Sequence, residues 1–176
     1  MAFIQFKIAV IRTEQLLIGI ALITFIVAGC GRGGHNGPSL QSGGLGLTRS
    51  EWQQLHGSAA SQDSGYVNYG DHRGRFTINF MDRGAAYIKR TYSDPGGVRL
   101  EEARHESRNV MPTDSKLIRT YQVTAGAVDL YSSESLKPIF PSDEYWVRGE
   151  PGQFIVLYFS DHEIVDSYVL ALGNNP

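Results

Sequence analysis

The stretch Arg75-Phe76-Thr77-Ile78-Asn79-Phe80 alternates polar and apolar side chains without interruption. Successive side chains of a β-strand point to opposite faces of its sheet, so this stretch predicts a strand with one apolar and one wet face. Asp82-Arg83-Gly84 then forms a compact turn, and residues 85–92 predict the returning arm of a hairpin. We therefore expect an antiparallel sheet whose polar face carries Arg75, Thr77 and Asn79.

A second hairpin is predicted near the end of the chain. Residues 153–159 are apolar on both faces, as expected for a central strand, and residues 164–172 return after a polar turn. Residues 117–123 and 128–131 also have strand composition and are separated by a turn around Gly126. The second half of the chain therefore repeats the pattern of the first.

Two helices are predicted, one ahead of each group of strands. Thr48-Arg49-Ser50-Glu51 is a capping box, Trp52 and Leu55 follow on one apolar face, and Gly57 ends the helix. Residues 100–110 carry apolar side chains at helical spacing and are stopped by Pro112. This order predicts an α+β domain, with an antiparallel sheet, helices packed on one face and two helix-then-strands units.

The N-terminal part of the chain differs in composition from the rest. An uncharged run from Leu16 to Gly29 follows Lys7 and Arg12 and is too short to span a bilayer, as in an export signal. It leads into Val27-Ala28-Gly29-Cys30, which contains the single cysteine of the chain. Residues 31–46 include seven glycines and predict a flexible tether.

The motif Val27-Ala28-Gly29-Cys30 resembles a bacterial lipobox. The resemblance implies cleavage before Cys30 and acyl chains on that residue, which hold the protein to a membrane. An ordinary secretory signal fits the same charges and length but needs no cysteine there. Gly31 and Arg32 come directly after Cys30, so no acidic residue is adjacent to it. This favours the outer membrane in a host with two membranes and otherwise the outer face of the cell membrane. We expect a signal peptide over 1–29, a lipidated cysteine and tether over 30–46, and one domain over 47–176.

The charges are unevenly distributed along the chain. Residues 73–119 contain ten Lys or Arg and six Asp or Glu, whereas residues 121–176 contain two and eight. The two halves either attract each other across their own interface or are merely solvated surfaces. Alternatively, they form a polarised surface that orients a partner or an anionic envelope polymer. The formal net charge of −2 does not favour binding to nucleic acid.

No catalytic motif is recognisable. His105-Glu106 would begin a zinc-protease motif, but residue 109 is Asn where the second histidine is required. There is no Gly-x-Ser-x-Gly elbow, so the serines at 132, 133 and 135 are interpreted as turn residues. The histidines at 56, 72 and 162 are interpreted as capping or surface residues. The sequence therefore predicts neither an enzyme nor a metal or cofactor site.

The arrangement Gly46-Leu47-Thr48, a short helix closed by Gly57 and a following hairpin resembles the tandem-repeat fold of β-lactamase-inhibitory protein and of small outer-membrane assembly lipoproteins. The tryptophan and the long second helix ending at Met111-Pro112 depart from that family. The resemblance implies a non-catalytic protein that binds another protein across its sheet.

Two functions are left open. The first is a lipid-anchored envelope protein that binds another envelope protein through Arg75, Thr77 and Asn79, or through Tyr145 and Trp146. Those aromatic residues lie between Pro141 and Pro151, in a loop that either exposes them as an anchor or packs its tryptophan onto the domain. The alternative is a small-ligand or glycan-binding, possibly weakly hydrolytic, surface domain. A broad exposed sheet face would favour the first function, and a pocket of convergent polar groups the second.

Overall fold

A computed structural model describes residues 39–161 and 163–176 of the chain. The predicted signal peptide, Cys30 and the greater part of the predicted tether lie outside these residues. In chain order the elements are α1 (Arg49–His56), β1 (Ser61–Asp63), β2 (Tyr66–Asp71), β3 (Gly74–Met81), β4 (Gly84–Tyr92), β5 (Val98–Arg99), α2 (Leu100–Arg108), β6 (Lys116–Val123), β7 (Gly126–Ser132), a 3-10 helix (Asp143–Tyr145), β8 (Gln153–Asp161) and β9 (Ile164–Leu172).

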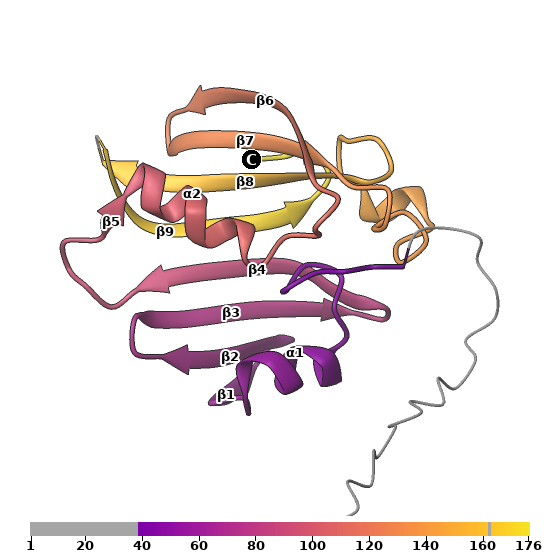
Figure 1. Ribbon diagram of the computed structural model, residues 1–176, viewed down its shortest axis with the longest axis horizontal. Helices are drawn as coiled ribbons and strands as arrows, with labels where there is room; N and C mark the ends of the chain where they lie inside the picture. The colour runs from indigo at the N-terminus through magenta and orange to yellow at the C-terminus, as the bar shows by residue number, and fades with distance from the viewer. Residues whose placement is uncertain (1–38, 162) are drawn as a thin grey trace, which may run out of the picture. The chain divides into compact units, whose positions relative to one another are not determined.

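All nine strands of the described residues belong to one antiparallel sheet (Figure 1). Eight of them follow the order β1-β2-β3-β4-β9-β8-β7-β6, and β5 pairs with β9 outside that path. The two long hairpins meet where β4 pairs with β9, with Ile88 opposite Leu170. As predicted, both hairpins lie in one antiparallel sheet.

The predicted α+β class is wrong, because the fold is mainly β. The described residues form nine strands, whereas α1 has eight residues and α2 has nine. Helices of that length extend only about 12–14 Å. Eight strands side by side span roughly 34 Å, so the two helices cannot form a layer over this sheet.

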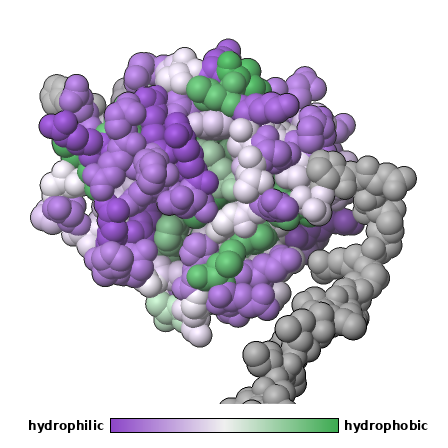
Figure 2. Space-filling view, viewed as in Figure 1, coloured by the Kyte–Doolittle hydropathy of each residue, from purple (hydrophilic) through white to green (hydrophobic). Residues whose placement is uncertain are grey.

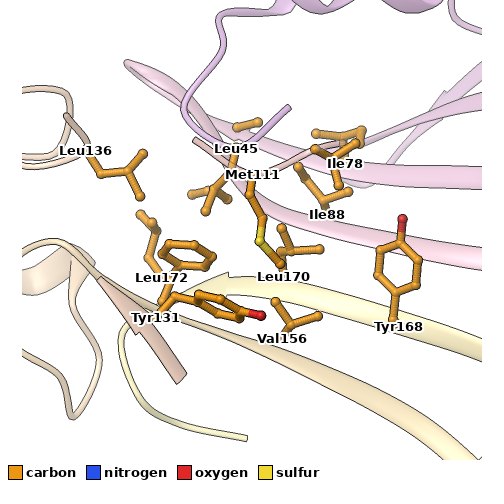
Figure 3. Packing of buried hydrophobic residues seen from close by; sticks show 14 of the residues in the cluster. Leu45, Ile78, Ile88, Met111, Tyr131, Leu136, Val156, Tyr168, Leu170 and Leu172 are labelled. Carbon is orange, nitrogen blue, oxygen red and sulfur yellow. The ribbon is translucent and has the colours of Figure 1, made fainter. Parts of the chain in front are cut away.

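Irregular segments supply much of the cover that helices were expected to provide. Leu45, Leu136, Phe140 and Trp146 lie outside the helices and strands, and all four are buried in the main hydrophobic cluster. In Figure 3 Leu45 and Leu136 lie beside core residues of the sheet. Since Leu45 was assigned to the tether, the folded domain begins before that predicted tether ends.

We call the side of the sheet against this main cluster the closed face. Its strand residues alternate along the chain, as in Val67 and Tyr69 of β2 or Phe154, Val156 and Tyr158 of β8. Ile78 is fully buried, and its neighbours Phe76 and Phe80 are partly buried against the cluster, as the alternation predicted.

The short helix α1 buries a single side chain, Trp52. Its capping box forms as predicted, with Thr48 accepting from the Glu51 amide and the Glu51 carboxylate accepting from the Thr48 amide. Leu55 was predicted to share the core, but it is 61% exposed. His56, four residues after Trp52, lies on that face instead and stacks on the indole at 4.2 Å between ring centres.

Two ion pairs, each with one buried partner, fix the polar groups of the closed face. Arg90 is buried in β4 and donates to both carboxylate oxygens of Asp71 at 2.9 Å. Arg104 of α2 donates to both oxygens of the buried Asp129 at 3.0 and 3.1 Å. Because Arg104 lies in the basic half of the sequence and Asp129 in the acidic half, part of the uneven charge is neutralised inside the domain.

Candidate functional site

The opposite side of the sheet, which we call the open face, carries a second hydrophobic cluster built from strand residues alone. Val128, Leu130, Ile155 and Leu157 are buried in it, and Tyr121, Val123, Phe159 and Ala171 pack against them. The helix residues Trp52 and Ala103 belong to the main cluster instead. On the helix-bearing side, hydrophilic side chains cover α2, and smaller apolar patches also reach the surface (Figure 2). The open face is the candidate surface because it carries the second hydrophobic cluster.

The strand register arranges the open face in rows that run across the sheet. One row contains Tyr66, Asn79, Tyr87, Ala171, Ile155, Leu130 and Arg119. The next contains Asn68, Thr77, Lys89, Val169, Leu157, Val128 and Tyr121. A third contains Arg75, Thr91, Ser167 and Phe159. The rows are mainly polar over β2, β3 and β4 and mainly apolar over β9, β8 and β7.

The predicted polar residues Arg75, Thr77 and Asn79 follow one another on the open face of β3. Arg75 is exposed, and the other two are half-buried. The Thr77 hydroxyl donates to the Asn68 side-chain oxygen at 2.8 Å. These three residues therefore lie on the face that the alternation predicted, where Asn79 is paired with Tyr87, Thr77 with Lys89 and Arg75 with Thr91.

An apolar groove runs between the open face and the loop before β8. Two adjoining cavities of about 350 and 300 Å³ share Tyr87, Val147, Ala171 and Leu172 in their walls. Tyr66, Met81 and Val147 are exposed, and Val147 leaves 51% of its surface open. Tyr66 packs edge-on against Tyr87 with 5.9 Å between ring centres. The groove therefore presents aromatic and aliphatic side chains to solvent.

Residues 141–152, which we call the rim loop, form one wall of this groove. Trp146 is only 3% exposed, and its indole N–H donates to the Phe140 carbonyl oxygen at 3.0 Å. The interpretation of Trp146 as an exposed anchor is therefore wrong, and the alternative of a tryptophan packed onto the domain holds. Tyr145 is half-buried and lines the groove, whereas the exposed position belongs to Val147, which sequence reasoning missed.

The candidate catalytic residues have structural partners. The Nε2 atom of His56 lies 2.7 Å from the Gly43 carbonyl oxygen. Ser133 and Ser135 donate to the Asp114 carboxylate at 2.6 and 2.9 Å. Burial acts to raise the pKa of Asp114, but these hydrogen bonds prevail and lower it. A carboxylate with a lowered pKa is a poor base. Its hydrogen bonds to Ser133 and Ser135 instead hold the start of the segment after β7 in place.

Histidine, cysteine and acidic residues do not gather into a metal site in the described part of the chain, where no group of three or more is found. His105 is exposed on α2, and His162 lies outside the described residues. Among the residues that the structure describes, no helix has the length and apolar character needed to cross a membrane.

Comparison with known proteins does not place the chain in a family. No family model matches it, and no curated protein matches it. Among solved structures, it is similar to a cysteine-rich secretory protein from Staphylococcus aureus subsp. aureus Mu50, with 12% sequence identity and a TM-score of 0.35. The alignment covers 77% of this chain and 52% of that chain, so this chain spans about half the length of that structure. A likeness this small carries no argument about fold or function.

Proposed function

We propose that this protein is a non-catalytic, lipid-anchored envelope protein that binds another envelope protein through the open face of its sheet. The observation that carries the proposal is the apolar groove bordered by Tyr66, Met81, Tyr87 and Val147. Contiguous exposed apolar surface in a soluble domain marks interaction sites. Tyrosine and methionine are also enriched at the centres of protein interfaces.

The polar part of the open face complements this groove. Asn79 lines the groove, Thr77 and Lys89 form the next row of β3 and β4, and Arg75 lies one row further. A protein interface typically combines an apolar centre with polar residues at its edge, and these residues supply polar side chains on one side of the groove. An enclosed pocket of convergent polar groups, the feature expected for a small-ligand protein, is not what these residues form.

The anchoring part of the proposal rests on the lipobox resemblance at residues 27–30. Acyl chains on Cys30 would hold the domain at a membrane surface, and the glycine-rich tether would let it reach a neighbouring protein. Confinement to one surface raises the local concentration of both partners, so a weaker interface is sufficient than between two proteins free in solution.

The proposal is tested by site-specific photo-crosslinking in the native membrane. A photoreactive amino acid is placed at Tyr87 or Val147 on the groove, and at Leu55, an exposed apolar control on α1. We expect one protein adduct of defined mass from both groove positions and none from position 55. Replacing Arg75, Thr77 and Asn79 together by alanine should lower the adduct yield without changing the melting temperature. Equal adducts from all three positions, or none from the groove, would contradict the proposal.

A further inference from the structure

A third cavity lies where the open face ends at β6. It measures about 450 Å³, and its walls include Arg119, Arg148, Glu150, Gln153 and Asn174, with Leu130 among its apolar lining residues. Unlike the apolar groove, it gathers polar side chains from β6, the rim loop, β8 and the C-terminal segment. None of its lining residues lines the apolar groove.

The donors in this cavity outnumber the acceptors. Within residues 39–161 and 163–176, neither Arg119 nor Arg148 pairs with a carboxylate. Arg73, Arg90 and Arg104 each bond an acidic side chain; what distinguishes Arg119 and Arg148 from the other arginines outside such pairs is that both line one cavity. Glu150 is the single carboxylate among the lining residues. The side chains around the cavity therefore carry a net positive charge.

Contacts with neighbouring side chains orient the donor groups. The Arg119 guanidinium lies over the Tyr121 ring, 4.9 Å from its centre, and the Tyr121 hydroxyl donates to the Asn174 side-chain oxygen at 3.2 Å. The Gln153 side-chain oxygen accepts from the Glu150 amide at 3.1 Å. Because both amide oxygens are engaged in this way, the NH₂ groups of Asn174 and Gln153 are left as donors.

Arg148 is held in a backbone conformation that arginine rarely adopts. Its φ is 54°, and it is the third residue of a turn closed by a 2.9 Å hydrogen bond from the Gly149 amide to the Trp146 carbonyl oxygen. Glycine or asparagine is usual where such a turn needs a positive φ. Strained residues of this kind persist at functional sites, where the position of the side chain matters more than its conformational energy.

The surrounding loop keeps this conformation fixed. The Asn174 amide donates to the Val147 carbonyl oxygen at 2.8 Å, and the Gly173 amide donates to the Gln153 carbonyl oxygen at 2.8 Å. A β-carbon on Gly149 would lie 2.9 Å from the Gly173 α-carbon, so the two segments approach too closely for a larger residue. Arg148 therefore extends from a backbone that is anchored on both sides.

We propose that this cavity binds an oxyanion, a carboxylate or a phosphate group, between Arg119 and Arg148. The planar guanidinium group offers paired N–H donors that match two oxygens of either anion. The side-chain NH₂ groups of Gln153 and Asn174 complete the donor set, and Glu150 weakens binding by like-charge repulsion. This site is independent of the apolar groove, and it takes either a free anion or an anionic group on a larger molecule.

The test uses the purified full chain in detergent and follows the side-chain Nε–H signals of its arginines by NMR. Sodium phosphate and sodium acetate are the two probes, added at constant ionic strength with chloride as the balance. We expect saturable shifts at Arg119 and Arg148 with a common dissociation constant. Tighter binding of phosphate would assign the site to phosphate groups, and tighter binding of acetate would assign it to carboxylates.

Variants separate a specific site from general attraction of anions. Arg119→Gln and Arg148→Gln should each weaken binding about tenfold, the loss expected for one charged bidentate donor. Arg83→Gln is the matched control, because Arg83 is exposed in the turn between β3 and β4 and does not line the cavity. The affinity of this variant for phosphate and acetate should stay unchanged. Glu150→Gln should tighten binding. Linear shifts that are equal at Arg83 and Arg148, or weaker binding by Glu150→Gln, would overturn the proposal.

Discussion

The Nζ atom of Lys89 lies 5.7 Å from the centre of the Phe159 ring on the open face. Lys89 is in β4 and Phe159 is in β8, so the side chain extends across the intervening β9. Its methylene stem covers apolar surface while its ammonium group stays at the solvent edge. This contact joins the polar and apolar parts of the proposed interface.

This position makes Lys89 a sensitive test of the interface. Lys89→Glu should lower the crosslink yield from Val147 severalfold, because it places a negative charge where the wild-type protein presents a positive charge to the partner. An exposed cation–π contact contributes about 0.5–1 kcal/mol, so thermal unfolding should show only a small loss of stability. Lys137→Glu, on a lysine that pairs with Glu134 away from the groove, is the control. A yield that falls equally in both variants would count against a specific interface.

The two sides of β3 should respond differently to truncation. Ile78 is fully buried in the main cluster, so Ile78→Ala should lower the free energy of unfolding by about 2–5 kcal/mol. Arg75 is exposed on the opposite side, and Arg75→Ala should change it by less than about 0.5 kcal/mol. Urea unfolding measures both values. Similar losses from the two variants would show that the assignment of the faces is wrong.

The hairpins, their alternation and the capping box were predictable because each depends on residues close together in sequence. The sheet order was not, since pairing of β4 with β9 joins residues about eighty positions apart and depends on how the two halves pack. The helices were overestimated because helical spacing at Leu100 and Trp52 says nothing about how much of a sheet such short elements cover. Trp146 was uncertain because its position is decided by tertiary contacts, the hydrogen bond to Phe140 and packing in the main cluster, which a loop sequence does not reveal.

The oxyanion site shows a different limit of sequence reasoning. Arg119 and Arg148 come from separate segments, and they meet because β6, β7 and β8 are neighbours in the sheet. The positive φ of Arg148 has no local signal, since arginine is not a residue that such turns select. The sequence did indicate a surplus of basic residues up to Arg119, but it could not show which of them lack a carboxylate partner.

The ion pair between Arg90 and Asp71 should make stability depend on pH. Burial acts to raise the pKa of Asp71, but hydrogen bonds from Arg90 and from the Arg73 amide prevail and lower it below its ordinary value of 3.8. A group whose folded pKa is lowered stabilises the fold above its unfolded pKa, and this contribution is lost as the pH falls through the folded value. The expected loss therefore lies below about pH 4.

Asp71→Asn isolates this contribution. The variant leaves the buried Arg90 without its carboxylate, so at pH 7 we expect a loss of up to about 3 kcal/mol, moderated because Asp71 itself is partly exposed. At pH 2 the carboxylate is closer to protonation than at pH 7, so the difference between the two proteins should shrink as the pH falls. Urea unfolding at both pH values measures it. A difference that stays constant would mean that Asp71 does not titrate with folding.

Anchoring through Cys30 is tested by Cys30→Ser. If the lipobox interpretation is right, this variant accumulates as unprocessed precursor and no longer incorporates labelled fatty acid, because the thiol is the acyl acceptor. The wild-type chain should carry the label and shorten on processing. Cleavage and release of the Cys30→Ser product at the wild-type rate would support an ordinary secretory signal instead.

Arg148 should show an opposition between stability and binding. Asparagine tolerates a positive φ better than arginine does, so Arg148→Asn should relieve the turn and raise the free energy of unfolding by about 0.5–1 kcal/mol, out of roughly 1–2 kcal/mol of conformational strain. The same change removes the guanidinium group, so phosphate and acetate should bind about tenfold more weakly, measured by the shift of the Arg119 signal. Arg148→Gln keeps an unbranched side chain at the strained position, and it should weaken binding without gaining stability. If Arg148→Asn were no more stable than Arg148→Gln, the turn would hold no strain, and the retention of arginine there would need no functional reason.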